Sequence, residues 1–215
     1  MARTARYHLA GAPPREAREA WYLLHGYAQL AAPFLDACAA LAAPGRLLAA
    51  PEALSRFYAE RPTSTDRTGG HGSATIGASW MTREMRDEEI ADYLRYLDAL
   101  DAAIGAPADA PRAALGFSQG AATAARWAAR GRTPVARLVL WGSPAPPDLE
   151  PPALAARGVR VVLVTGRGDR LFPPERLESE AARLAGAGLR VVTRLFDGGH
   201  AIHGPTLAEL ATLPD

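Results

Sequence analysis

Six short apolar runs, separated mostly by longer segments of helical character, constrain the fold of this chain more than any other feature. The runs are Trp21 to Leu24, Arg46 to Ala49, Ala113 to Phe117, Leu138 to Trp141, Val159 to Val164 and Val191 to Phe196. Most of them are continuous rather than alternating, which is typical of parallel strands buried on both faces of a sheet. This rhythm predicts an α/β fold with a doubly wound, mostly parallel sheet and helices on both faces.

The segments between the runs supply the predicted helices. The clearest extends from Glu84 to Ile104, with an apolar stripe at helical spacing, acidic residues in its first turn and Gly105 at its end. Further helices are expected at residues 31–42, 119–130, 175–185 and 206–212, and Tyr7 to Leu9 is predicted as an antiparallel edge strand.

The stretch from Pro51 to Met81 interrupts the alternation of predicted strands and helices, because it is rich in Pro, Gly, Ser and Thr. Loops of this length inside a compact domain are either functional or disordered, so we expect a long loop that forms a wall of the active site. There is no internal repeat and no domain linker. The chain is therefore predicted to form a single domain over residues 1–215.

The charge balance is nearly even, with 24 basic and 23 acidic residues, and no basic patch predicts a nucleic-acid partner. Neither a signal peptide nor a transmembrane run is evident, so we expect a cytoplasmic protein without membrane insertion. The single cysteine, Cys38, cannot form an internal disulfide and is expected to be a small buried apolar residue. The histidines lack the spacing of metal-ligand pairs, so neither a metal nor a cofactor is expected.

The most informative motif is Gly116-Phe117-Ser118-Gln119-Gly120, between a predicted strand and a predicted helix. A serine on so sharp a turn adopts a strained backbone, and glycines two residues before and after it let neighbouring backbones approach. The Gln119 amide at the start of the helix can then donate to a developing oxyanion. The motif predicts a nucleophile elbow that carries Ser118, in preference to a flexible glycine turn.

A serine becomes a good nucleophile only when a base takes its proton and an acid orients that base. Asp169 follows the run that ends at Val164, and His200 follows the run that ends at Phe196. Both thus lie at the same edge of the sheet as Ser118, in the chain order Ser, Asp, His. We predict that Asp169 orients His200 as the general base.

Three residues compete for these two roles. His203 is the rival base, but it is expected to lie toward the next helix. Asp197 is near His200 in sequence, yet its carboxylate would have to fold back on a glycine-rich loop to reach it. Glu175 follows two prolines and is expected to open a helix, where the positive end of the dipole accounts for its charge.

His25 ends the first long strand, and because it precedes the serine we expect it to brace the oxyanion loop rather than to catalyse. The Tyr27 amide beside it is predicted to pair with the Gln119 amide as the oxyanion hole. Trp80, Trp141 and Phe172 lie near strand ends or the long loop and are candidate aromatics of the substrate pocket.

These motifs together resemble the phospholipase/carboxylesterase family of α/β hydrolases, which includes small bacterial carboxylesterases and acyl-protein thioesterases. The resemblance rests on Leu24-His25-Gly26-Tyr27, on the elbow from Gly116 to Ala121, on Gly166 to Asp169 with Pro173, and on Gly199-His200. It implies the α/β-hydrolase fold with Ser118 as nucleophile, Asp169 as orienting acid, His200 as base, and the Tyr27 and Gln119 amides as oxyanion donors. Family members often have glycine where this chain has Ala28, and an alanine with positive φ would cost about 1 kcal/mol.

The function expected from these features is that of a serine carboxylesterase, which hydrolyses short- to medium-chain acyl esters through an acyl-enzyme intermediate. A thioesterase or lysophospholipase with the same triad is the nearest alternative. A non-catalytic scaffold that binds a ligand is the alternative from another class, because a fold does not determine a function. The expected partner is a small-molecule acyl ester, and the sequence leaves a homodimer open.

Overall fold

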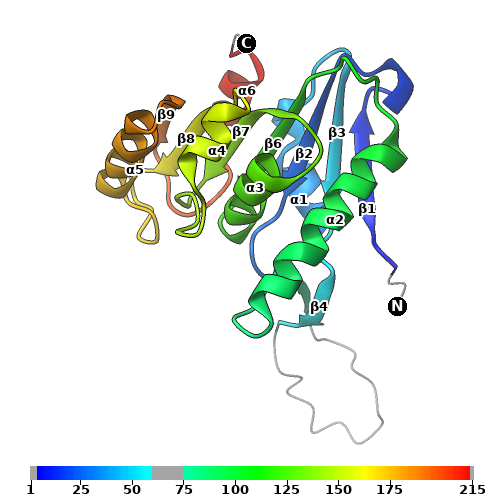
Figure 1. Cartoon of the computed structure of the whole chain (residues 1–215), viewed down its shortest axis with the longest axis horizontal. Helices are drawn as coiled ribbons and strands as arrows, with labels where there is room; N and C mark the ends of the chain where they lie inside the picture. Colours follow the sequence, from blue (N-terminus) through cyan, green and yellow to red (C-terminus); the bar gives the residue numbers. More distant parts are fainter. Residues whose placement is uncertain (1–3, 60–74, 214–215) are drawn as a thin grey trace, which may run out of the picture.

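The computed structural model describes residues 4–59 and 75–213 and is built around a seven-stranded sheet (Figure 1). In spatial order the strands are β1 (Tyr7–Gly11), β3 (Arg46–Pro51), β2 (Glu19–Leu24), β6 (Arg112–Phe117), β7 (Val135–Trp141), β8 (Arg160–Gly166) and β9 (Arg190–Phe196). All neighbouring strands are parallel except β1, which is antiparallel to β3. The predicted parallel sheet and its antiparallel edge strand are therefore confirmed.

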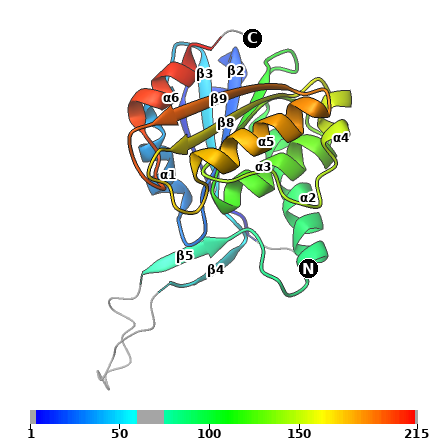
Figure 2. The ribbon, with the colours of Figure 1, turned by 90° about the vertical axis from the view of Figure 1, so that its left-hand side faces the viewer.

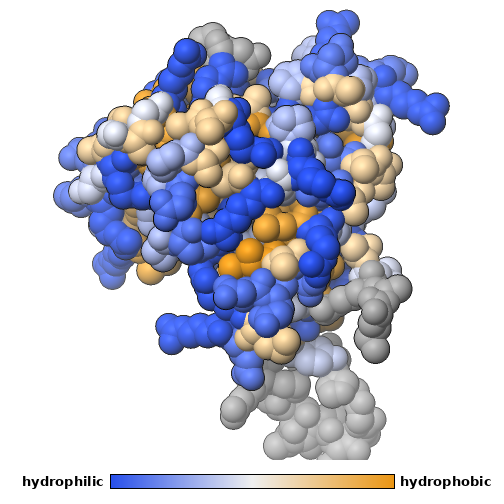
Figure 3. Space-filling view, viewed as in Figure 1, coloured by the Kyte–Doolittle hydropathy of each residue, from blue (hydrophilic) through white to orange (hydrophobic). Residues whose placement is uncertain are grey.

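Helices cover both faces of the sheet, as Figure 2 shows. One face carries α1 (Ala31–Ala37) and α6 (Gly204–Ala211), and the other carries α2 (Arg86–Ile104), α3 (Gln119–Arg130), α4 (Pro151–Ala156) and α5 (Pro174–Gly186). Short 3-10 turns occupy Pro14–Glu16 and Ala39–Leu41. The second turn is the end of the helix predicted for residues 31–42. Figure 3 shows hydrophilic residues over much of this face, with an apolar patch exposed in the region of α2 and α3. The buried apolar residues of both helices face the sheet.

Two apolar clusters, one on each face of the sheet, form the core. Strand β2 contributes alternately to both: Trp21 and Leu23 join the cluster beneath α1 and α6, whereas Tyr22 and Leu24 join the cluster beneath α2 and α3. All four side chains are fully buried. A strand buried on both faces needs apolar residues at consecutive positions, which explains the continuous run in the sequence.

The stretch predicted as a long loop contains regular structure at both ends. Strand β4 (Ser55–Tyr58) pairs antiparallel with β5 (Ile76–Ser79), and this two-stranded sheet projects from the main body (Figure 2). Residues 60–74 of the stretch lie outside the described residues. The loop prediction is wrong for β4 and β5, because strands of only four residues leave too short a pattern to stand out in a stretch rich in Pro, Gly, Ser and Thr.

Cys38 is fully buried behind α1, as predicted. Burial raises the pKa of its thiol to about 12, so the thiol stays protonated at neutral pH. Across residues 4–59 and 75–213, no helix has the length and apolar character needed to cross a bilayer.

Candidate active site

Ser118 lies on a strained turn between the end of β6 and the start of α3, with φ of 53° and ψ of −115°. A Cβ atom on Gly116 would lie 2.2 Å from the carbonyl oxygen of Gly120, and a Cβ on Gly120 would lie 2.1 Å from that of Leu24. Neither position has room for a side chain. The Ser118 amide donates a hydrogen bond to the Trp141 carbonyl at 2.8 Å, which ties the turn to β7. A strained serine between a strand and a helix is the local geometry that the prediction of an elbow requires.

Asp169 and His200 are joined by a hydrogen bond of 2.7 Å between Oδ2 and Nδ1. Asp169 follows β8 and is 3% exposed, and its Oδ1 accepts hydrogen bonds from the amides of Leu171 (2.8 Å) and Phe172 (3.0 Å). Burial alone would raise the pKa of this carboxyl, but the hydrogen bonds from His200 and from the two amides outweigh it and lower the pKa. Asp169 is therefore an anion that fixes the ring of His200.

His200 lies directly beside the elbow. Its ring centroid is 4.8 Å from that of Phe117, the residue before Ser118. Gly142, with φ of 69°, provides the space behind the ring, since a Cβ there would lie 2.8 Å from Cε1 of His200. The indole of Trp141 donates to the Ala201 carbonyl at 2.9 Å and holds the loop that carries the histidine. The structure thus gathers the ends of β6, β8 and β9 that carry the predicted triad residues.

The three competing residues lie elsewhere. The Asp197 side chain is 95% exposed and pairs with Arg167 at 3.3 Å. Glu175 is in the first turn of α5, as expected. His203 caps α6 and has its Nδ1 2.9 Å from the hydroxyl of Thr206. Among the described residues, the carboxylate paired with His200 is that of Asp169.

His25 has the structural role that its place in the sequence predicted. It is fully buried, its Nδ1 is 2.8 Å from the Gly26 carbonyl, and its Nε2 accepts a hydrogen bond from the Ala53 amide at 3.1 Å. This pattern requires the neutral ring with the proton on Nδ1. Burial lowers its pKa, which favours the same neutral form. His25 therefore holds the start of the loop that carries Tyr27, a predicted oxyanion donor.

The predicted oxyanion donors lie on two elements. Gln119 is the first residue of α3, where the backbone amide has no partner within the helix. Tyr27 lies in the loop after β2, with an exposed side chain whose ring stacks on Phe57 at 5.2 Å. The next residue, Ala28, has φ of 62°, so this position does adopt the positive φ that favours glycine.

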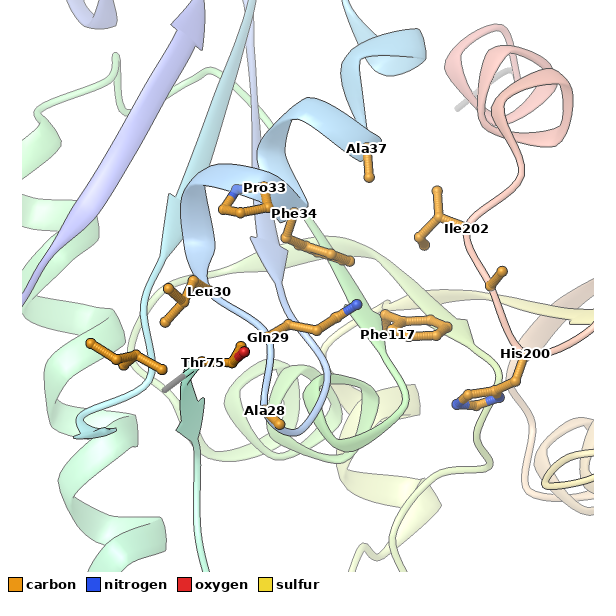
Figure 4. A pocket seen from close by; sticks show the side chains of 12 residues that line it. Ala28, Gln29, Leu30, Pro33, Phe34, Ala37, Thr75, Phe117, His200 and Ile202 are labelled. Carbon is orange, nitrogen blue, oxygen red and sulfur yellow. The ribbon is translucent and has the colours of Figure 1, made fainter. Parts of the chain in front are cut away.

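A cavity of about 520 Å³ opens beside His200 (Figure 4). Its wall comes from four places in the chain: the loop after β2 with α1, the start of β5, the end of β6, and the loop after β9. The lining residues are Ala28, Gln29, Leu30, Pro33, Phe34, Ala37, Thr75, Ile76, Phe117, His200, Ala201 and Ile202. Thr75 and Ile76 belong to the stretch predicted as a pocket wall.

The aromatic residues predicted for the pocket do not line this cavity. Trp80, Trp141 and Phe172 are at most 3% exposed and belong to the core clusters. The indole N–H groups of Trp80 and Trp141 both donate to backbone carbonyls, and that of Trp80 donates to the carbonyl of His25 at 2.9 Å. Phe172 instead borders a separate cavity between α5 and the loop after β7. Phe117, inside the elbow motif itself, is the pocket aromatic that the sequence could have indicated.

Comparison with known proteins supports the fold. No family model matches the chain, and no curated protein sequence matches it. Among solved structures, acyl-protein thioesterase 2 of Zea mays is 19% identical and superposes with a TM-score of 0.71 over 97% of this chain and 96% of that one. A carboxylesterase of Mesorhizobium loti is 22% identical, with a TM-score of 0.71 over 96% and 92% of the two chains. A carboxylesterase of Bacillus cereus is 14% identical, with a TM-score of 0.66 over 96% and 92%. The predicted α/β-hydrolase fold is confirmed, and with it the resemblance to the phospholipase/carboxylesterase family at the level of the fold.

Proposed function

We propose that this protein is a serine ester hydrolase that cleaves short- to medium-chain acyl esters through an acyl-enzyme intermediate. The observation that carries the proposal is the 2.7 Å hydrogen bond between buried Asp169 and His200, beside the strained turn that bears Ser118. An ionised acid bound to Nδ1 keeps the proton on that nitrogen. It leaves Nε2 of His200 as the base for the serine hydroxyl.

The reaction then has two halves. His200 takes the Ser118 proton through Nε2 while Oγ attacks the ester carbonyl carbon, and the imidazolium returns that proton to the departing alcohol. In the second half His200 deprotonates a water molecule, which attacks the acyl-enzyme. The carboxylic acid leaves, and the proton goes back to Ser118. No cofactor is required by this scheme.

The negative charge on the carbonyl oxygen is stabilised by the backbone amides of Tyr27 and Gln119. Such preorganised donors contribute strongly to acyl transfer, and removing one typically costs about 10² to 10³ in turnover. The Gln119 amide also belongs to the start of a helix, where the partial positive charge of the helix dipole favours an anion.

The cavity beside His200 supports an uncharged acyl chain as the bound part of the substrate. Its volume of about 520 Å³ lies within the range of small-molecule sites. Apart from His200, the side chains in its wall are apolar or uncharged, so a charged group would lose its hydration without gaining a partner. A cavity of this volume accepts an acyl chain of short or medium length.

A thioesterase is the second candidate, since acyl-protein thioesterase 2 of maize and the carboxylesterase of Mesorhizobium loti superpose equally well. Ester and thioester share the acyl group and differ in the leaving atom. Paired substrates with the same acyl chain, one with an oxygen leaving group and one with sulfur, therefore separate the two activities. A lysophospholipid with the same acyl chain tests the third activity, that of a lysophospholipase.

The decisive experiment is a screen of nitrophenyl esters from acetate to palmitate, with wild-type protein and the Ser118→Ala variant. We expect turnover that is highest for soluble short or medium chains and is abolished in the variant. A fluorophosphonate probe should label wild type but not the variant, because the probe reacts with an activated serine. Turnover that survives in Ser118→Ala, or faster hydrolysis of emulsified long-chain lipid than of butyrate esters, would contradict the proposal.

A further inference from the structure

We propose that Trp80 is a positioning residue that sets the distance between the two halves of the oxyanion hole. Its indole Nε1 donates a hydrogen bond to the His25 carbonyl at 2.9 Å, on the loop that carries one oxyanion amide. Its backbone amide donates to Oε1 of Gln119 at 3.0 Å, the residue that carries the other. One residue thus connects the two elements. The inference rests on the proposed function.

The contacts on the loop side are buried. Trp80 is 3% exposed, and its ring lies 5.2 Å from the imidazole of His25 and 6.4 Å from the ring of Tyr93. Water does not reach this buried position, so removal of the indole N–H would leave the His25 carbonyl without that hydrogen-bond donor. The loop would then move to find another partner.

The contacts on the Gln119 side involve its whole side-chain amide. While Oε1 accepts from the Trp80 amide, Nε2 donates to the hydroxyl of Ser79 at 3.0 Å and to the carbonyl of Met81 at 2.9 Å. The amide therefore spans three consecutive residues. This arrangement explains why the elbow has a glutamine after its serine, although only the backbone amide of that residue is assigned to the chemistry.

Strand β5, which leads into Trp80, is bound to the oxyanion loop by two further hydrogen bonds. The Ala28 amide donates to the Ala78 carbonyl at 3.0 Å, and the Ala78 amide donates to the Gln29 carbonyl at 3.2 Å. A Cβ on Gly77 would lie 2.7 Å from Cα and from the carbonyl oxygen of Ala28, so the strand rests directly on the loop backbone. These contacts hold Ala28 at its positive φ of 62°.

Trp80→Phe tests the inference, because it keeps an aromatic ring and removes the indole donor. Trp127→Phe is the matched control: Trp127 is also fully buried, its Nε1 also makes one hydrogen bond, to Asp98 at 2.9 Å, and its ring also contacts a tyrosine edge-on. Each variant is assayed for kcat, KM and melting temperature. Affinity for an alkylboronic acid is measured as well, since its tetrahedral adduct with Ser118 places an oxygen in the oxyanion hole.

We expect Trp80→Phe to lower kcat by on the order of 10-fold to 10²-fold, with KM changed less than about threefold, because misplaced donors affect the transition state more than substrate binding. Boronate affinity should fall by a similar factor. Trp127→Phe should lower the melting temperature comparably and keep both kcat and boronate affinity. Gln119→Met, which retains the backbone amide, should reproduce the kcat loss if Trp80→Phe does not fold.

The outcomes separate the two proposals. Wild-type protein that neither turns over esters nor binds the boronate contradicts the proposed function. An active wild type whose Trp80→Phe variant keeps kcat and boronate affinity overturns the positioning role. Equal losses of kcat in both tryptophan variants overturn it too, since they would reflect general destabilisation.

Discussion

Replacement of Asp169 by Asn should place the wrong tautomer of His200 next to Ser118. The amides of Leu171 and Phe172 both donate to Oδ1 of Asp169, so that position must remain an oxygen in the variant. The new NH₂ group is then forced into the position of Oδ2, which faces Nδ1 of His200. Nδ1 can only accept from an NH₂ group, and the neutral ring therefore carries its proton on Nε2.

The neighbouring hydroxyl permits this arrangement. Thr165 lies 3.3 Å from Oδ2 of Asp169, but its hydroxyl donates to the Phe172 carbonyl at 2.6 Å and can therefore accept from the new amide. Every hydrogen bond of the buried side chain is kept, so the fold should be unaffected. With Nε2 protonated, His200 cannot take the serine proton, and we expect turnover to fall on the order of 10⁴-fold, as for the serine proteases.

The assay is ester turnover for Asp169→Asn beside Asp197→Asn, with a thermal melt for each. Asp197 is the matched control because it lies three residues before His200, yet its side chain is 95% exposed and pairs with Arg167, which is also exposed. Its variant should keep turnover within about threefold, since such surface pairs contribute little. A larger loss for Asp197→Asn, or full turnover in a folded Asp169→Asn, would refute the assignment of the acid.

Three further predictions concern the triad, an ion-pair network and the oxyanion loop. Ser118→Ala and His200→Ala should each abolish turnover, and the double variant should lose little more, because the two residues act as one unit. Steady-state kinetics in which the loss of the double variant equals the product of the two single losses would contradict proton transfer between them. Hydrogen bonds and ion pairing from Arg126 lower the pKa of Asp148 far below its ordinary 3.8, so Asp148 stabilises the fold above that pH and the contribution is lost on acidification. Asp148→Asn should cost about 2 to 3 kcal/mol at pH 7, only somewhat less at pH 3 and least toward pH 1 in denaturant titrations, whereas a cost that does not change with pH would exclude the ion pair. Ala28→Gly should raise the free energy of unfolding by up to about 1 kcal/mol, and with it the melting temperature, since glycine tolerates φ of 62°. A lower melting temperature would show that the alanine is unstrained.

The strands and the strained turn at Ser118 were predictable because each is specified by local chemistry. Continuous apolar runs mark buried strands wherever they occur, and β2, β3, β6, β7, β8 and β9 all coincide with predicted runs. Helix α3 begins and ends where expected, at Gln119 and Arg130. By contrast α4 (Pro151–Ala156) was missed, because two prolines that read as a loop instead occupy its first turn, where the missing N–H groups have no helical partner to lose.

The substrate cavity was not predictable, because its wall has no local signature. Aromatic side chains near strand ends were expected to face it, yet Trp80 and Trp141 turn inward and bond backbone carbonyls, as buried indoles require. The observed wall is formed by stretches far apart in sequence: most of it follows Tyr27 or His200, and Thr75, Ile76 and Phe117 complete it. Only the sheet brings these stretches together.

Parts of the cavity wall belong to the same loops as the proposed reacting groups, which links substrate specificity to turnover. Ala28 and Gln29 continue the loop that carries one proposed oxyanion amide, and Ala201 and Ile202 continue the loop that carries the proposed base. A substitution in the wall therefore displaces backbone that also holds a reacting group. Changes at Gln29 or Ile202 should alter kcat together with KM, whereas Ala37, in the last turn of α1, can be enlarged to shorten the preferred acyl chain without touching either loop. Acyl-length profiles of Ala37→Leu and Ile202→Ala, with kcat and KM resolved for each ester, would distinguish these two parts of the wall.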